Sequence, residues 1–104
     1  MSTEFSYFYL TCDESQKEQL AQALLEAKLI VCAKFLSVDA MYWWSGAIER
    51  AKEALIMMEG PSGNFAKIEQ EIAKIHSYDT FVLTQVPMEN INNDAQQWIR
   101  NELK

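Results

Sequence analysis

The chain has 104 residues, of which 49% are hydrophobic, so we expect one globular domain covering residues 1–104. Its formal net charge of −6 disfavours nucleic acid and anionic membranes as partners, because both attract basic surfaces. The N-terminal segment has neither a basic start nor a long apolar run. We therefore expect no signal peptide, no membrane-spanning helix and a cytoplasmic location.

The first predicted strand covers residues 4–12, along which aromatic and aliphatic side chains alternate. Asp13 is a typical N-cap residue, and Gln16 follows it at the spacing of a capping box. A helix is expected from there to about Lys28. Its apolar face consists of Leu20, Ala23, Leu24 and Ala27, which recur at helical spacing.

The second predicted strand is the most β-prone part of the chain. It covers residues 29–37 and continues over residues 40–44 after an irregularity at Val38-Asp39. Both of its faces are apolar, whereas a domain of this size covers only one face with its own core. We therefore expect a second chain or a ligand on the other face.

A hairpin follows, with adjacent tryptophans just before its turn. Ser45-Gly46 predicts a tight turn, because glycine accepts positive φ, and residues 47–59 form the return strand. Alternation sends successive side chains of the first arm to opposite faces: Met41 and Trp43 to one, Tyr42 and Trp44 to the other.

The last third of the chain contains two helices and one strand. Residues 60–63 break the chain, and a helix then carries apolar side chains at core spacing and ends near His76-Ser77. Residues 80–86 form the last strand, which Pro87 stops, and Asn92 or Asn93 caps a terminal helix. The apolar positions of the first of these helices are Phe65, Ile68, Ile72 and Ile75.

The order of elements is β-α-β-β-α-β with a C-terminal helix. This order predicts a ferredoxin-like α+β sandwich with an extended hairpin between its second and third strands. Right-handed crossovers place both main helices on one face of the sheet. The other face is left open to pack on a partner.

Motifs for catalysis and for nucleotide binding are absent from the sequence. Its three glycines form no P-loop or dinucleotide fingerprint, and no G-x-S-x-G segment is present, so we do not expect an enzyme. His76 is the only histidine, and Cys12 and Cys32 fit no zinc-binding spacing. The two cysteines are predicted to be free, buried thiols.

Cys12 and His76 are the two side chains best suited to bind a soft metal ion. Cys12 ends the first strand, and we expect the second helix to end near the opposite end of the sheet. A strand of eight residues spans about 26 Å. Only a subunit interface would then bring the two side chains together.

Several segments together resemble the CutA family of divalent-cation tolerance proteins. Residues 42–48, Y-W-W-S-G-A-I, resemble the family's Y-x-W-x-G-x-I hairpin, and Glu53 falls where the family has a glutamate. Residues 76–79, H-S-Y-D, resemble its HPYE motif. Residues 20–33 and 94–99 resemble its LA..L…LAACV segment and its terminal Y-L-x-W-I helix.

The resemblance implies a homotrimer whose sheets pack around a threefold axis. It also implies binding of copper or another divalent cation through the first-strand cysteine and the motif histidine, which match Cys12 and His76. Asp79 is a candidate third ligand, because Val82 occupies the family's usual glutamate position. Tyr42, Trp43, Trp44 and Tyr78 are the candidate interface residues.

Other functions remain open at this point. His76 suits a helix C-terminus by its interaction with the helix dipole, and Cys12 suits a buried core position. Ser77 and Phe81 replace both prolines of the family's longer HPYEVPEI motif, which favours a divergent member that binds metal weakly or not at all. The alternatives are a structural trimer without metal binding and a trimeric signalling module of the PII type, whose members bind nucleotides.

Overall fold

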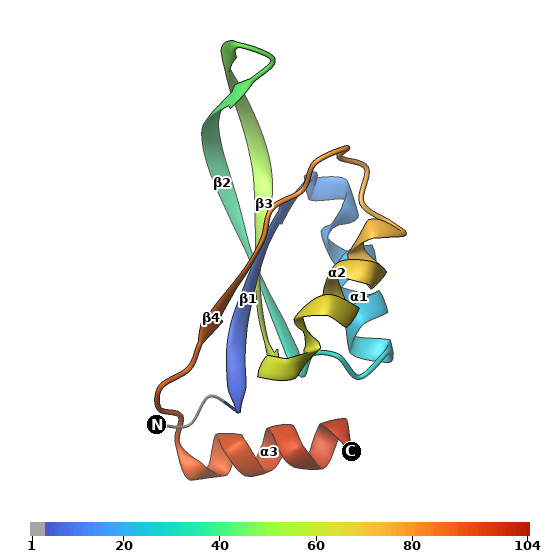
Figure 1. The fold of residues 1–104 in the computed structure, drawn as a ribbon, viewed down its shortest axis with the longest axis vertical. Helices are drawn as coiled ribbons and strands as arrows, with labels where there is room; N and C mark the ends of the chain where they lie inside the picture. The colour runs from blue at the N-terminus through green and yellow to red at the C-terminus, as the bar shows by residue number, and fades with distance from the viewer. Residues whose placement is uncertain (1–3) are drawn as a thin grey trace.

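The computed structural model describes residues 4–104, which form one antiparallel sheet and three α-helices (Figure 1). The strands are β1 (Phe5–Cys12), β2 (Cys32–Trp44), β3 (Ala47–Pro61) and β4 (Leu83–Pro87), in the spatial order β2-β3-β1-β4. The helices are α1 (Lys17–Glu26), α2 (Phe65–Ala73) and α3 (Asn93–Leu103). Helices α1 and α2 cover one face of the sheet, and α3 lies across one end (Figure 1). The predicted ferredoxin-like α+β fold is confirmed.

The core lies between the sheet and the helices α1 and α2, because each element turns one apolar side toward the others. Each fully buried aliphatic or aromatic side chain contributes about 2 kcal/mol through removal of its surface from water. Its members in strands and helices include Phe8 and Leu10 of β1, Ile56 and Met58 of β3, Leu20 and Leu24 of α1, and Ile68 and Ile72 of α2.

The opposite face of the sheet is also apolar, and we call it the open face. Residues paired across neighbouring strands have their side chains on the same face. Tyr9 pairs with Met57, Leu36 with Leu55, and Tyr7 with Val86. Helices α1 and α2 lie on the other side of the sheet, and Leu36 and Val86 are exposed.

Strands β2 and β3 pair without interruption from Cys32↔Glu59 to Trp44↔Ala47. The irregularity predicted at Val38-Asp39 is therefore wrong: Asp39 lies on an exposed segment, where a polar side chain does not interrupt the pairing. The predicted turn is confirmed, with φ of 50° at Ser45 and 80° at Gly46.

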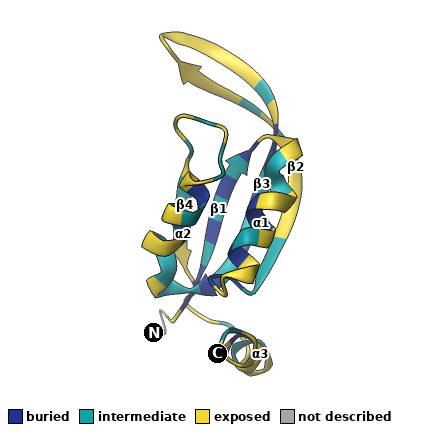
Figure 2. Cartoon of the chain, turned by 90° about the vertical axis from the view of Figure 1, so that its right-hand side faces the viewer, coloured by how far each residue is buried: buried dark blue, intermediate teal, exposed yellow. Residues whose placement is uncertain are grey.

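Residues 38–53 extend beyond the end of β1 and pair only within the hairpin, and we call them the hairpin arm. Figure 2 shows that this arm is exposed along most of its length. Its largest exposed side chains are Met41, Tyr42, Trp43, Trp44 and Ile48.

The start of β2 differs from the prediction, because the strand begins at Cys32 and not at Leu29. Lys28 has a φ of 60° and closes α1 through its N–H bond to the carbonyl of Leu25, while Leu29 N–H bonds to Leu24. Leu29 and Ile30 are then buried against β3 at Gly60. A Cβ at Gly60 would lie 2.7 Å from the Leu29 carbonyl oxygen, so this close approach requires glycine.

The predicted capping box at Asp13 and Gln16 is wrong in its second half. The Asp13 carboxylate accepts from the N–H of Ser15, as an N-cap does. The Gln16 side chain instead reaches the end of α2, where it donates to the Ile75 carbonyl at 3.1 Å and accepts from Ser77 N–H at 3.0 Å. Gln16 thus joins the start of α1 to the segment that follows α2.

Helix α3 packs at the far end of the sheet through a small cluster of Phe5, Met88 and Ile99. Lys28 donates to the Glu102 carbonyl at 2.8 Å, and Arg100 forms two hydrogen bonds with the carboxylate of Glu4. These contacts link α3 to the end of α1 and to the start of β1.

Candidate functional site

The structure places Cys12 and His76 at the same end of the sheet, so the expectation that they lie at opposite ends is wrong. The His76 Nε2–H donates to the carbonyl of Thr11, the neighbour of Cys12, at 2.9 Å. The reason is strand direction: α2 ends beside the start of β4, and β4 is antiparallel to β1. The start of β4 therefore lies beside the end of β1, within a single chain.

Both ring nitrogens of His76 have hydrogen-bond partners. Nε2 donates to Thr11, and Nδ1 accepts from the backbone N–H of Tyr78 at 3.1 Å. This pair fits the tautomer with its proton on Nε2. The ring also packs against Tyr78 and, stacked at 5.2 Å between centroids, against Phe81. In this arrangement His76 holds the segment after α2 against the end of β1.

Cys12 is fully buried on the helix face of β1. Burial raises the pKa of its thiol to about 11, and the charges of Asp13, Glu14 and Glu53 act in the same direction. The thiol is therefore protonated at neutral pH, whereas a metal ligand must be a thiolate. Cys32 is also a free thiol, but it is only half-buried and lies on the open face, so its predicted place in the core is wrong.

The donors of the predicted metal site do not fit a metal ion as they lie. Cys12 has its proton, and the lone pair of His76 accepts a hydrogen bond from Tyr78. Asp79 is exposed and lines a pocket whose lining includes neither Cys12 nor His76. Within residues 4–104, no three Cys, His, Asp or Glu side chains gather as a candidate metal site.

A pocket of about 480 Å³ lies where the hairpin arm meets the loop between α2 and β4. This loop covers residues 74–82, because β4 begins at Leu83 and not at the predicted Thr80. We call the pocket the arm pocket. It is lined by Thr11, Ala40, Tyr42, Trp43, Trp44, Glu53, Tyr78, Asp79, Thr80 and Val82.

Five of the predicted site residues line the arm pocket together. They are Tyr42, Trp43 and Trp44 of the arm, and Tyr78 and Asp79 of the loop. Cys12 and His76 are absent from its lining, although the His76 ring is hydrogen-bonded to Thr11 and Tyr78, which both line it. The sequence analysis selected these five residues as interface residues and as a metal ligand, and it did not predict that they line one pocket within a single chain.

Glu53 is the charged residue of the pocket lining that the sequence analysis did not select as a site residue. It lies at the base of the arm, on the open face, and is only 7% exposed. The structure shows no hydrogen bond or ion pair from its carboxylate to any other residue in the range 4–104. The sequence did contain a signal, because Glu53 has the same strand parity as the apolar Leu55 and Met57.

Tyr78 lines the arm pocket together with Glu53. Burial and, after it, the negative charges of Glu53 and Asp13 raise the pKa of Tyr78 to about 12. Its phenol is therefore neutral at physiological pH. The pocket thus combines neutral aromatic side chains with the carboxylates of Glu53 and Asp79.

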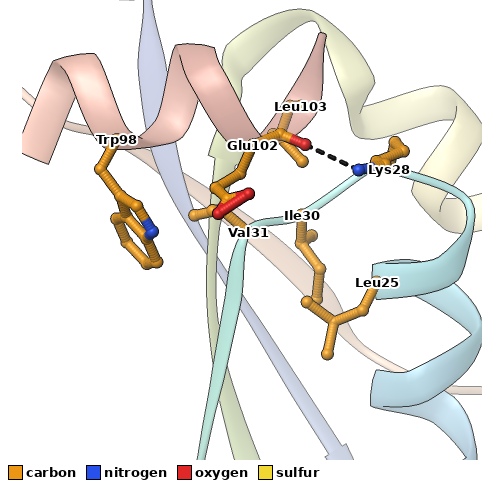
Figure 3. A pocket seen from close by; sticks show the side chains of 7 residues that line it. All are labelled: Leu25, Lys28, Ile30, Val31, Trp98, Glu102 and Leu103. Atoms are coloured by element: carbon orange, nitrogen blue, oxygen red, sulfur yellow. Dashed lines mark hydrogen bonds between the residues drawn. The ribbon is translucent and has the colours of Figure 1, made fainter.

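A second, smaller hollow of about 190 Å³ lies beside α3 (Figure 3). Its lining includes Trp98 and Leu103 of α3 and Leu25 of α1, and Lys28 spans it to bond with the Glu102 carbonyl. The hollow is therefore the gap between α3 and the segment at the end of α1, where α3 packs onto the rest of the domain. None of the helices described is long and apolar enough to cross a membrane.

A family model and similar curated proteins agree on the family to which this chain is related. Residues 6–102 match the family model for the CutA1 divalent ion tolerance protein. The chain is 30% identical over 95 residues to the divalent-cation tolerance protein CutA of Archaeoglobus fulgidus, covering 90% of this chain and 93% of that protein. It is 27% identical over 94 residues to protein CutA of Homo sapiens, covering 88% of this chain and 52% of the human protein.

Solved structures have the same fold. The periplasmic divalent cation tolerance protein CutA from Archaeoglobus fulgidus superposes with a TM-score of 0.92 at 29% identity, covering 96% of this chain and 99% of that one. CutA1 from Pyrococcus horikoshii superposes with a TM-score of 0.89 at 27% identity, covering 95% and 98%. The chain therefore belongs to the CutA1 divalent ion tolerance family.

Proposed function

We propose that residues 1–104 form one domain that acts in divalent-cation tolerance as a homotrimer, and that its subunits meet through the open face and the hairpin arm. The observation that carries the assembly is the exposure of the arm. Trp43 is 72% exposed and Ile48, paired with it across the hairpin, is 58% exposed. Apolar surface of this kind on a small domain is typical of a protein interface.

The open face adds to this surface. Leu36 and Val86 are exposed on it, and Val82 is exposed at the edge of the arm pocket. A subunit packed against this face would remove these side chains from water at a gain of about 25 cal/mol per Å² of apolar area. The same contact would support the arm, which has no third strand beside it.

Binding of copper or another divalent cation by Cys12, His76 and Asp79 is proposed as weak. It requires the Cys12 thiol to lose its proton and His76 to release the N–H of Tyr78. Both steps cost free energy, and a soft Cys/His pair favours copper(I) over zinc, which prefers three or four protein ligands. The protein is proposed to be cytoplasmic and to have no catalytic activity.

Light scattering at micromolar concentration tests the assembly, and a mass of one subunit that persists on concentration would contradict it.

Calorimetric titration with copper(I), zinc and ATP tests the ligands. Weak copper binding that Cys12→Ser and His76→Ala both reduce, in a protein that remains trimeric, supports the proposed site. Tight ATP binding would instead favour the signalling module, and the absence of binding to any of these ligands would favour a structural trimer.

A further inference from the structure

Helix α3 is attached to the domain through fewer buried side chains than α1 and α2 are. Within residues 4–104, Ile99 is the one fully covered side chain of α3, whereas α1 and α2 each bury two or more. Ile99 packs on Phe5 and Met88, and this cluster shares no buried residue with the main core of the described chain. Because hydrophobic stabilisation grows with the apolar area removed from water, packing stabilises α3 less than it stabilises the other two helices.

The helical conformation of α3 also depends on its attachment to the sheet. The helix has 11 residues, a length at which an isolated helix is only marginally stable in water. Its N-cap residue, Asn92, makes no capping hydrogen bond through its side chain. Neither its own hydrogen bonds nor its small apolar contact is therefore enough to keep α3 in place. Polar contacts from its C-terminal half supply the rest.

The first polar contact joins α3 to the residue before β1. Arg100 Nη2 donates to one carboxylate oxygen of Glu4 at 2.6 Å, and Arg100 Nε donates to the other at 3.0 Å. The guanidinium also lies over the Phe5 ring, 5.6 Å from its centroid. Both side chains of this ion pair are 45% exposed, so dissolved salt screens the attraction between them.

The second polar contact joins the end of α1 to the end of α3. Lys28 Nζ donates to the Glu102 carbonyl oxygen at 2.8 Å (Figure 3). Carbonyl groups in the last turn of a helix lack partners within the helix, and a cation there also interacts favourably with the helix dipole. Lys28 has a φ of 60°, a conformation in which glycine is favoured. Its side chain therefore stabilises α3, although its backbone conformation is unfavourable for the end of α1.

We propose that α3 is a movable cover that opens and closes over the end of the sheet as a separate unit, held closed by Arg100 and Lys28. Opening uncovers Phe5 and Met88, while the main core stays folded because no α3 residue is among its members in the described chain. Because one of the two contacts is an exposed ion pair, the open fraction rises with ionic strength. The cover uses no residue of the arm pocket or of the proposed metal site.

The test is hydrogen exchange of the full chain in its native assembly, followed by mass spectrometry at pH 7.5. After correction for intrinsic rates, amides of α3 should exchange at least about a hundredfold faster than the buried amides of α1 and α2. Low concentrations of urea should change this exchange little, because opening of α3 exposes little surface. An increase in sodium chloride from about 0.05 M to about 1 M should raise the exchange rate of α3 by about two- to fivefold.

Two variants assign the closed state to its polar contacts. Arg100→Gln keeps a long side chain and removes the charge, so it should raise the exchange rate of α3 by about two- to fivefold and remove most of its salt dependence. Lys28→Gly removes the other contact and suits the φ of 60°, so it should raise exchange in α3 without raising it in α1. Lys67→Gln, at an exposed position of α2, removes the same charge and should leave α3 unchanged.

Three results would overturn the proposal. Amides of α3 that exchange as slowly as those of α1 and α2 would show that α3 is part of one cooperative unit or is covered by a neighbouring subunit. Equal acceleration of all three helices in Arg100→Gln would show a general loss of stability. Unchanged exchange of α3 in both variants would show that neither contact holds it closed.

Circular dichroism and light scattering check that each variant retains the fold and mass of the unaltered protein. If a variant fails to fold, the comparison of α3 with α1 and α2 in the unaltered chain, at low and high salt, still decides. Subunit mass and metal titration are separate readouts, so failure here leaves the proposed function standing.

Discussion

At the scale of single residues, three buried or half-buried side chains, those of Cys12, Glu53 and His76, lie at the end of the sheet where the hairpin arm begins. His76 uses both ring nitrogens to hold the loop after α2 against β1. Cys12 lies beside this contact as a protonated, buried thiol. Glu53, on the other face of the same strand pair, has its carboxylate open to the arm pocket. The hydrogen bonds of His76, the protonation of Cys12 and the burial of Glu53 are therefore set by neighbouring residues and not by residue type alone.

Cys12 makes the stability of the protein fall at alkaline pH. Its pKa is raised from 9.0 to about 11, so the folded state keeps a proton that the unfolded chain loses. The contribution of the protonated Cys12 thiol to the free energy of unfolding is fully present below pH 9. It falls by about 2 kcal/mol as the pH rises from 9 to 11. Urea unfolding of the unaltered chain and of Cys12→Ala at pH 8 and pH 11 measures it.

The difference between the two proteins isolates the thiol, because Tyr78, whose pKa is raised to about 12, titrates in both. Cys12→Ala should lose less stability than the unaltered chain between these pH values. If both proteins lose the same amount, the thiol is not the group responsible.

Gly60 and Gly63 offer a matched pair of glycine substitutions. In Gly60→Ala the new Cβ would meet the Leu29 carbonyl oxygen at 2.7 Å and the Ile30 Cα at 3.2 Å, both of them backbone atoms. We expect a loss of about 1–3 kcal/mol in the free energy of unfolding. In Gly63→Ala the Cβ has nothing within 4 Å, and the change should stay within about 0.5 kcal/mol. Denaturant midpoints compare the two, and similar losses would contradict the close approach.

At the scale of elements, α1 and α2 are coupled by a side chain at the start of one and the end of the other. Gln16 bonds to the Ile75 carbonyl and to the Ser77 N–H, immediately before the loop that forms one wall of the arm pocket. His76 anchors the same loop to β1. The loop is thus held at its start by two independent contacts.

Gln16→Ala should loosen this loop. Removal of the two hydrogen bonds should cost about 1–2 kcal/mol and raise the exchange rate of the Ser77 amide hydrogen. Gln19→Ala, at an exposed position early in α1, is the control and should change neither quantity appreciably. Hydrogen-exchange measurements on the three proteins check this, and an unchanged Ser77 amide in Gln16→Ala would mean that His76 alone holds the loop.

At the scale of the whole molecule, the chain is elongated, with principal extents of 45 × 26 × 22 Å. The arm accounts for this shape, because it projects beyond the body of the domain (Figure 1). An exposed aromatic hairpin of this kind gains stability when a second surface covers it. The shape of the monomer therefore favours the proposed trimer.

The arm provides the sharpest test of assembly. Ile48→Asp introduces a charge at an arm position that is 58% exposed, so it costs the isolated chain little but should destabilise an interface formed there. We expect the mass by light scattering to fall from three subunits toward one. Ala66→Asp, at an exposed position of α2 away from the arm, should leave the mass unchanged. Loss of the trimer in both variants, or in neither, would contradict an interface at the arm.

The sequence by itself was sufficient for the order of the elements, the alternation along the strands and the hairpin turn. These features depend on local properties: side chains repeat every two residues in a strand and every 3.6 in a helix, and Gly46 accepts the φ of the turn. The family resemblance also followed from short local segments. The same local patterns identified Tyr42, Trp43, Trp44, Tyr78 and Asp79 as residues of interest.

Only the tertiary structure decided which of these residues meet. The antiparallel direction of β1 and β4 brought His76 to Thr11 beside Cys12, and the partner of Gln16 lies 59 positions away at Ile75. In the sequence, Glu53 was marked only by its strand parity and by its match to the family's glutamate, whereas its burial and its place beside Tyr78 and Asp79 in one pocket depend on the tertiary structure. Contacts of this kind join distant segments, so their physical cause is the packing of the whole sheet and not any local preference.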